Sequence, residues 1–192
     1  MATEYELKFK ANYVNLNDIS NRFPQKASAF EMETVYYDTA NRALSARHYT
    51  LRRRLENGIS VCTLKTPAGD ARNEWATEND FIEYAIDDLI AQGAPEDLRK
   101  LAKEGLFPIC GAKFTRFAKT ITLENAVVEL ALDHGYLFAG NKKEPLCEVE
   151  VELKSGDKTA CQQFAQSLAR EFMLETEPRS KFARARNLSK GE

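Results

Sequence analysis

Histidine and cysteine are scarce in this chain, which has two histidines and four cysteines among 192 residues. The cysteines stand singly and no CxxC pair occurs, so the sequence favours neither a zinc site nor a redox motif. We expect each cysteine to be a buried, unreactive thiol, because free cysteine packs as a small hydrophobe. With only His48 and His134 present, a histidine-based catalytic triad is a poor hypothesis.

Long apolar runs and nucleotide-binding loops are absent as well. No stretch approaches the ~20 apolar residues that a membrane-spanning helix needs. The N-terminal segment MATEYELKFK lacks the apolar centre of a secretion signal. Neither GxxxxGKS nor GxxxxGKT occurs, which argues against a P-loop enzyme. These absences predict a cytoplasmic protein with no membrane partner.

The composition is that of a folded chain with balanced charge. Hydrophobic residues make up 43% and charged residues 29%, and the formal net charge is −2. Disordered chains are poorer in apolar residues and carry more net charge. No internal repeat, low-complexity segment or Gly/Ser linker divides the sequence, so we expect one domain over residues 1–192.

The hydrophobic pattern predicts four helices and seven strands. The helices cover 15–24, 95–104, 158–174 with Asp157 as its cap, and a short basic segment after Ser180. The strands cover 4–10, 31–38, 49–56, 59–66, 72–78, 127–133 and 148–153. Most of these strands alternate charged with apolar residues, as strands with one buried face do. We therefore expect an α+β fold around an antiparallel sheet.

On two of the predicted strands the acidic charges repeat on one face. Glu148, Glu150 and Glu152 share a face, and Glu4 and Glu6 share another. Neighbouring like charges repel, so such faces are costly unless a cation lies among them. Hard divalent cations such as Mg²⁺, Mn²⁺ or Ca²⁺ bind carboxylate oxygens, so the pattern predicts a metal-binding face. The alternative is an ordinary antiparallel sheet with one solvent-exposed face and no bound metal.

Basic residues alternate in the same way on other strands. They are Lys8, Arg52, Arg54, Lys65, Arg72 and Arg116. Guanidinium and ammonium groups hold phosphate oxygens. Acidic and basic strands around one lumen would hold a metal ion and a polyanion together, in a barrel whose interior is a polar tunnel.

The chain opens with Glu4-Tyr5-Glu6-Leu7-Lys8, which has the pattern ExExK. Further segments follow in order: Tyr36-Tyr37-Asp38-Thr39, Leu51-Arg52-Arg53-Arg54, Leu64-Lys65, Arg72 with Glu74, Arg116, Glu129 to Asp133, Glu148 to Glu152, and Ser180-Lys181. This ordered set resembles the CYTH superfamily, the triphosphate tunnel metalloenzymes. ExExK alone is a weak signal, but the set spans nearly the whole chain. Segments 128–135, 148–156 and 180–184 are similar to those of bacterial inorganic triphosphatases.

The resemblance implies an eight-stranded antiparallel β-barrel that forms a charged tunnel, with helices packed on the outside. It implies hydrolysis of inorganic triphosphate to pyrophosphate and phosphate, with Mg²⁺ or Mn²⁺ as cofactor. The implied metal ligands are Glu4, Glu6, Glu74, Glu129, Asp133, Glu148 and Glu150. The implied phosphate contacts are Lys8, Arg52, Arg54, Lys65, Arg72, Arg116 and Lys181. Among these residues we expect Lys8, Lys65 and Glu150 to act in catalysis.

The sequence departs from the family pattern at one position. Related enzymes often have a second basic residue two positions after the arginine at 116, where this chain has Ala118. The next residue, Lys119, falls on the opposite face of the strand. We therefore expect a weaker grip on phosphate at this point.

Three other functions compete with inorganic triphosphatase. A class IV adenylate cyclase of the same superfamily would use similar groups, but no adenine pocket is evident in the sequence. A thiamine triphosphatase could stack its substrate on Trp75, although alternation puts Trp75 opposite Glu74 and predicts a packing role. A non-catalytic polyphosphate or nucleotide sensor would need the basic residues but not the full acidic set.

The C-terminal segment is basic and could suggest a nucleic-acid partner. Its charges are Arg179, Lys181, Arg184, Arg186 and Lys190. So few charges would give at most weak, salt-sensitive binding. We interpret them as a solvated helix face and expect a small triphosphate, with no nucleic acid, as the partner.

Overall fold

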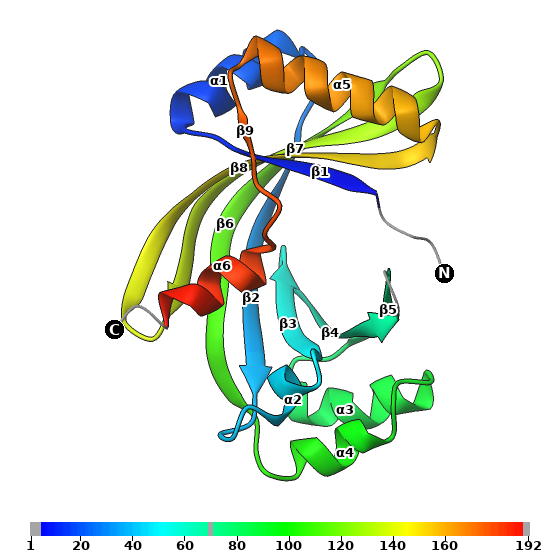
Figure 1. Cartoon of the computed structure of the whole chain (residues 1–192), viewed down its shortest axis with the longest axis vertical. Coiled ribbons are helices and arrows are strands. Elements are labelled where there is room, and N and C mark those ends of the chain that lie inside the picture. The colour runs from blue at the N-terminus through cyan, green and yellow to red at the C-terminus, as the bar shows by residue number, and fades with distance from the viewer. Residues whose placement is uncertain (1–4, 69–70, 190–192) are drawn as a thin grey trace. The chain divides into compact units, whose positions relative to one another are not determined.

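In the computed structural model, which describes residues 5–68 and 71–189, runs of strands are separated by helices (Figure 1). The strands are β1 (Glu6–Lys10), β2 (Ser28–Asp38), β3 (Thr50–Glu56), β4 (Ile59–Ala68), β5 (Ala71–Glu78), β6 (Phe107–Thr122), β7 (Ala126–Ala139), β8 (Lys142–Gly156) and β9 (Glu175–Thr176). The helices are α1 (Tyr13–Arg22), α2 (Ala43–Ala46), α3 (Ile82–Ala91), α4 (Asp97–Ala102), α5 (Lys158–Glu171) and α6 (Lys181–Leu188).

All strands belong to one sheet, whose hydrogen-bonded order is β5-β4-β3-β2-β6-β7-β8-β1-β9. Pairing is antiparallel between β2, β3, β4 and β5, and also where β1 meets β8 and β9. The predicted α+β class with an antiparallel sheet is confirmed. Eight strands were expected, and the ninth is the two-residue β9. Among the described residues the order has two ends, β5 and β9, instead of a closed ring.

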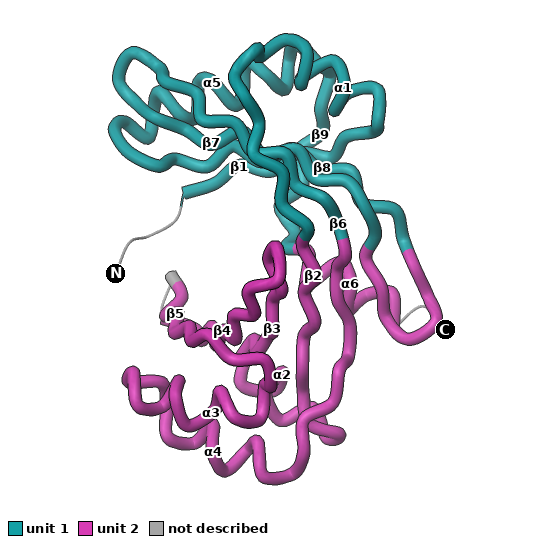
Figure 2. Tube along the Cα trace, turned by 180° about the vertical axis from the view of Figure 1, so that it is seen from behind, with its two compact units in different colours: residues 1–31, 114–136, 144–180 teal, residues 32–113, 137–143, 181–192 magenta. Residues whose placement is uncertain are grey.

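The chain divides into two compact units, which we describe separately (Figure 2). Unit 1 comprises residues 1–31, 114–136 and 144–180, and unit 2 comprises residues 32–113, 137–143 and 181–192. The expectation of one domain over residues 1–192 stays a prediction.

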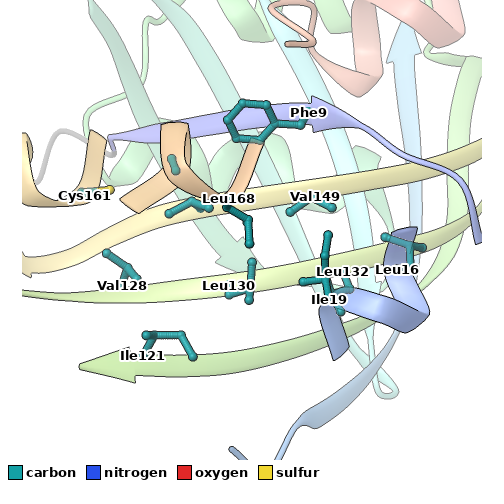
Figure 3. Packing of buried hydrophobic residues seen from close by; sticks show 12 residues of the cluster. Phe9, Leu16, Ile19, Ile121, Val128, Leu130, Leu132, Val149, Cys161 and Leu168 are labelled. Atoms are coloured by element: carbon teal, nitrogen blue, oxygen red, sulfur yellow. The ribbon is translucent and has the colours of Figure 1, made fainter. Parts of the chain in front are cut away.

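In unit 1, helices α1 and α5 cover the apolar side of the strands (Figure 3). Phe9 of β1, Leu130 of β7 and Val149 of β8 pack there against Ile19 of α1 and Leu168 of α5. Because side chains alternate along a strand, the charged residues between these apolar positions lie on the other side of the sheet. The register shows this directly, since Phe9 is paired with Val149 while Lys8 is paired with Glu150.

In unit 2, α2 packs against β3, α3 packs against β4 and β5, and α4 packs against α3. The core contains Leu51 and Leu64 from the strands and Leu89 from α3, with Trp75 of β5 packed against it. The predicted packing role of Trp75 is confirmed. Arg53 lies on the same side, where its guanidinium donates to the Asp80 carbonyl oxygen at 3.1 Å. This contact explains how an arginine is accommodated on an otherwise apolar face.

Lys119 fixes the end of α1 to strand β6. Its side chain is 5% exposed, and its Nζ donates to the carbonyl oxygens of Ser20 at 2.7 Å and Phe23 at 2.6 Å. The last carbonyls of a helix lack partners within the helix, and a cation satisfies them well. Lys119 therefore faces the helices, as predicted, and Ala118 occupies the opposite side of β6.

Helix α1 begins earlier than its apolar spacing suggested. A capping box forms at Asn12, whose side chain accepts from the Asn15 backbone N–H while the Asn15 side chain accepts from the Asn12 N–H. We predicted that the helix begins at residue 15, so this boundary was wrong by two residues. The cap of α5 by Asp157 is confirmed, with Oδ1 and Oδ2 accepting from the N–H groups of Thr159 and Ala160.

Helix α6 forms after Ser180 as predicted, but its basic face is not fully solvated. Arg184 is 8% exposed, and the Arg186 guanidinium lies 5.4 Å from the centre of the Phe182 ring. Phe182 in turn packs against Tyr36 of β2, with ring centres 4.7 Å apart. The interpretation as a solvated face is wrong for Arg184, because packing of α6 buries it.

The cysteines are free thiols, and the prediction of buried, unreactive groups is confirmed for three of them. Cys62, Cys110 and Cys161 are buried, and Cys147 is partly buried. Burial raises the pKa of all four thiols, to about 11 for Cys62 and about 12 for Cys110. In the part of the chain that the structure describes, no helix is long and apolar enough to cross a membrane.

Candidate active site

Three carboxylates meet on the side of the unit 1 sheet that faces away from α1 and α5. Asp133 and Glu148 are 0% exposed and Glu150 is 8% exposed. Each offers an oxygen that lies within 4.8 Å of the others. Alternation places them there, because Leu132, Val149 and Val151 occupy the helix side of the same strands. We call these three residues the acidic trio.

The Arg116 guanidinium is bound to the acidic trio from β6. Its Nε donates to Asp133 Oδ1 and one terminal nitrogen donates to Asp133 Oδ2, both at 2.8 Å. The same terminal nitrogen also contacts Glu150. Burial alone would lower the pKa of Arg116, but the hydrogen bonds and charges of Asp133 and Glu150 raise it above its usual value. The guanidinium therefore stays charged.

The donor set of the trio fits a hard divalent cation. Carboxylate oxygens are the ligands that Mg²⁺ and Mn²⁺ prefer, and three converging carboxylates are typical of such sites. Among the described residues, neither histidine belongs to this cluster. The ring of His134 packs instead between Phe117 and Tyr13, with ring centres 5.8 Å apart in both pairs.

Strand β1 brings Glu6 and Lys8 to the same side of the unit 1 sheet. In the register with β8, Lys8 stands opposite Glu150 and Glu6 stands opposite Glu152. Lys8 Nζ lies 3.4 Å from Glu6 Oε1. These residues line an open pocket of about 390 Å³ together with Leu7, Phe9, Thr176, Glu177 and Pro178. The pattern ExExK thus places charges next to the acidic trio.

Glu129 of β7 lies near a lysine that the sequence pattern did not identify. Lys154 of β8 places its Nζ 2.9 Å from Glu152 Oε1 and 3.7 Å from Glu129 Oε1. The signal that could have indicated Lys154 is its position two residues after Glu152, on the same strand face. A metal ion bound at Glu129 would have to compete with this ammonium group.

In unit 2, predicted phosphate contacts and a predicted metal ligand form one group. Lys65 and Glu74 are partners across β4 and β5, with Nζ 2.8 Å from Oε2. A terminal nitrogen of Arg52 lies 3.8 Å from Glu74 Oε1. Glu74 therefore neutralises two cations of unit 2 and is not part of the acidic trio.

Arg54 lies on the same side of these strands. We call Arg52, Arg54, Lys65 and Glu74 the charged face of unit 2. Its Nε donates to Thr34 Oγ1 at 3.2 Å, and Arg52 stands opposite Tyr36 in the register. Arg72 of β5 is exposed, and Lys181 is the first residue of α6. Thr34 is thus a neighbour of a predicted phosphate contact that the sequence did not indicate.

The predicted site residues thus form two groups, one within each unit. Asp133, Glu148, Glu150 and Arg116 form one buried cluster, and Arg52, Lys65 and Glu74 form a second group in the other unit. Glu4 lies outside the described residues. The individual metal, phosphate and catalytic roles stay predictions.

Asp38, from the motif Tyr36-Tyr37-Asp38-Thr39, has a structural role. Its buried carboxylate accepts from the backbone N–H groups of Thr39 at 2.8 Å, Leu44 at 3.0 Å and Ser45 at 3.2 Å. These bonds fix the turn that leads into α2. The motif therefore marks the end of β2 and supplies no ligand to the acidic trio.

Known proteins of similar sequence include an inorganic triphosphatase. The inorganic triphosphatase of Haemophilus influenzae is 28% identical over 142 residues, which is 70% of this chain and 39% of that protein. The chain thus spans about two-fifths of the relative's length.

Solved structures share the fold at low sequence identity. HpAC1 from Hippeastrum, described as a candidate adenylyl cyclase with a dominant triphosphatase activity, has a TM-score of 0.66 at 17% identity, covering 97% of this chain and 96% of that one. A candidate adenylate cyclase from Bacillus halodurans has a TM-score of 0.59 at 18% identity, covering 93% and 94%.

The CYTH domain model matches residues 2–185. This range contains the acidic trio, Arg116 and the charged face of unit 2. On that match over nearly the whole sequence, the chain belongs to the CYTH domain family.

Proposed function

We propose that this protein is a metal-dependent hydrolase that cleaves inorganic triphosphate to pyrophosphate and phosphate. The observation that carries the proposal is the acidic trio, three buried carboxylates whose oxygens converge within 4.8 Å. Burying three carboxylates together is unfavourable unless cations compensate them. A site built in this way is suited to a divalent metal, and we propose Mg²⁺ or Mn²⁺.

Asp133, Glu148 and Glu150 would hold this metal, with Glu6 and Glu129 as further ligands on the same side of unit 1. A bound divalent ion would supply charge neutralisation of phosphate oxygens and a water of lowered pKa. In hydrolysis, water adds to a terminal phosphorus, the bridging P–O bond breaks, and pyrophosphate leaves with the electron pair. We assign Glu150 to orienting that water, an assignment supported by its membership of the trio and its position opposite Lys8 in the register.

The basic residues would bind the polyanion and stabilise the charge on the leaving pyrophosphate. Lys8 supplies this charge in unit 1. Arg52, Arg54 and Lys65 supply it on the charged face of unit 2, with Arg72 and Lys181 as further contacts. We assign Lys8 and Lys65 to the catalytic step, since ammonium groups are compact donors that can follow the developing charge.

The comparison with the Haemophilus influenzae inorganic triphosphatase supports the substrate class. The four free thiols support the cytoplasmic location that we propose, because disulfides are rare in that compartment. No feature of the described residues favours a nucleobase pocket, so the cyclase is the weaker candidate.

The test measures product release from inorganic triphosphate, ATP and thiamine triphosphate with Mg²⁺, Mn²⁺ or EDTA, and assays cyclic AMP alongside. We expect metal-dependent release of phosphate and pyrophosphate from inorganic triphosphate at the highest rate. Formation of cyclic AMP from ATP would favour the cyclase instead. Tight binding of triphosphate without turnover of any substrate would favour the sensor.

A further inference from the structure

Arg116 was predicted to contact phosphate, but in the structure its guanidinium contacts two carboxylates of the acidic trio. Both oxygens of Asp133 accept hydrogen bonds from it at 2.8 Å, and Glu150 accepts from the same terminal nitrogen. Parallel hydrogen bonds of this kind are the strongest geometry of an arginine–carboxylate pair. Two of the three carboxylates of the acidic trio are therefore occupied by one side chain.

Burial strengthens the effect of this pairing on metal binding. The exposed fractions of the side chains alone are 17% for Arg116, 0% for Asp133 and 10% for Glu150, so water screens their charges weakly. Phe114 covers the guanidinium from one side, with its ring centre 5.8 Å away. Within such an enclosed cluster, a second cation gains less attraction from the carboxylates and is repelled by the guanidinium.

We propose that Arg116 is an internal cation that competes with the divalent metal for Asp133 and Glu150 and holds the acidic trio together until the metal binds. The inference rests on the proposed function and adds a regulatory element to the same site. When the metal binds, Arg116 gives up part of its pairing with the trio, and its guanidinium becomes available to phosphate oxygens. Metal binding and phosphate binding are thereby coupled through one residue.

The test is a direct titration of the metal-free protein with Mn²⁺ in the absence of triphosphate. Electron paramagnetic resonance measures the concentration of the free ion at each step of the titration. If Arg116 competes with the metal, Arg116→Gln binds Mn²⁺ roughly 10- to 100-fold more tightly than the wild type. Arg116→Lys keeps the charge but loses the two parallel hydrogen bonds, so its affinity lies between the two. Equal or weaker Mn²⁺ binding by Arg116→Gln would overturn the proposal.

A matched control separates this effect from the loss of a surface charge. Arg22 of α1 also pairs with a carboxylate in unit 1, with its Nε 3.2 Å from Glu171 Oε1, but both side chains are exposed. Arg22→Gln removes the same charge outside the trio and leaves the Mn²⁺ affinity unchanged. A comparable increase in affinity for Arg22→Gln would show a general electrostatic effect and overturn the assignment to Arg116.

Arg116→Gln removes a cationic partner of the buried Asp133 and Glu150, so its folding is monitored by circular dichroism. If this variant folds only when Mn²⁺ is added, the metal has replaced the missing cation and the proposal is supported. If it does not fold at any Mn²⁺ concentration, the Mn²⁺ affinity of Arg116→Lys is the test instead. An affinity for Mn²⁺ equal to that of the wild type in Arg116→Lys would then overturn the proposal. Because binding is measured without substrate, wild-type hydrolysis of inorganic triphosphate tests the proposed function separately.

Discussion

Lys65 and Glu74 face each other across β4 and β5, with the ammonium nitrogen 2.8 Å from a carboxylate oxygen. Glu74 also lies 3.8 Å from Arg52, so one acidic side chain neutralises two predicted phosphate contacts. In the free protein, Glu74 thus occupies a position where an anionic substrate would be attracted.

Replacing Glu74 by Gln should increase affinity for triphosphate when no metal is present. The change removes the anion that competes with phosphate for Lys65 and Arg52. Because Glu74 is partly exposed, we expect roughly a two- to fivefold effect, measured by calorimetry in EDTA. Glu33→Gln is the control, since Glu33 pairs with Lys113 at 3.1 Å elsewhere in unit 2 and should leave the affinity unchanged. Unchanged or weaker binding by Glu74→Gln would contradict this role.

Replacing Glu148 by Gln should abolish hydrolysis and leave the fold intact. The change removes one of the three carboxylates of the acidic trio but keeps nearly the same shape. We expect a loss of at least about 100-fold at saturating metal, because even changes behind the ligands of a metal site cost ~10- to 100-fold. Steady-state rates and circular dichroism check this prediction.

A second ligand variant and a surface control accompany the Glu148→Gln measurement. Glu4→Gln should lose activity in the same way, since the ExExK pattern assigns Glu4 to the metal. Glu124 is exposed in the turn between β6 and β7, and Glu124→Gln should retain the wild-type rate. Wild-type turnover by Glu148→Gln at saturating metal would show that Glu148 is not a ligand.

Lys119→Met should destabilise the protein without affecting the chemistry. The variant leaves the carbonyl oxygens of Ser20 and Phe23 without the buried ammonium group that they now share. Hydrogen bonds to charged groups contribute about 1.5–3 kcal/mol, so we expect a loss of about 2 kcal/mol in the free energy of unfolding, measured in urea. Lys26 is exposed, and Lys26→Met should change stability by less than about 0.5 kcal/mol. An equal effect of both variants would contradict the capping role.

Stability should decline as the pH rises above about 8.5, because the buried thiols cannot ionise in the folded state. The pKa of Cys110 is raised to about 12 by burial, against a small opposing effect of Arg186. An unfolded thiol ionises near ~8.5, so between these values the unfolded state binds fewer protons and is favoured as pH increases. We expect Cys110→Ala to reduce this decline by about 2 kcal/mol between pH 8 and 10. Identical pH dependence in both proteins, measured by urea unfolding, would contradict the prediction.

Local patterns predicted the strands that carry the acidic trio. Charged and apolar residues alternate strictly along 148–153, and along 127–133 Glu129 and Asp133 lie on the face opposite Val128, Leu130 and Leu132, as alternation assigns. Strand β6 was not predicted as a whole, because Pro108 and Gly111 interrupt its pattern. The structure explains Gly111, since a Cβ atom there would lie 2.3 Å from both Phe138 and the Thr34 carbonyl oxygen.

Helix α3 was missed because no side-chain cap marks its beginning. Its N-cap is Phe81, which makes no side-chain capping bond, and its stability comes from packing of Ile82, Ile86 and Leu89 in the unit 2 core. The pairing of Arg116 with Asp133 could not be predicted from the sequence either. It depends on how β6 and β7 align in the sheet, and alternation fixes the face of a residue but not its neighbour across strands.

The most direct test of the account is to follow inorganic triphosphate by phosphorus NMR with the wild-type protein, in Mn²⁺ or Mg²⁺ and then in EDTA. Mg²⁺ gives the sharper spectra, and Mn²⁺ samples are read after the metal is removed. We predict that triphosphate disappears only with metal and that pyrophosphate and phosphate form in equal amounts. A chain that leaves triphosphate intact at saturating metal, or cleaves it equally well in EDTA, would contradict the account.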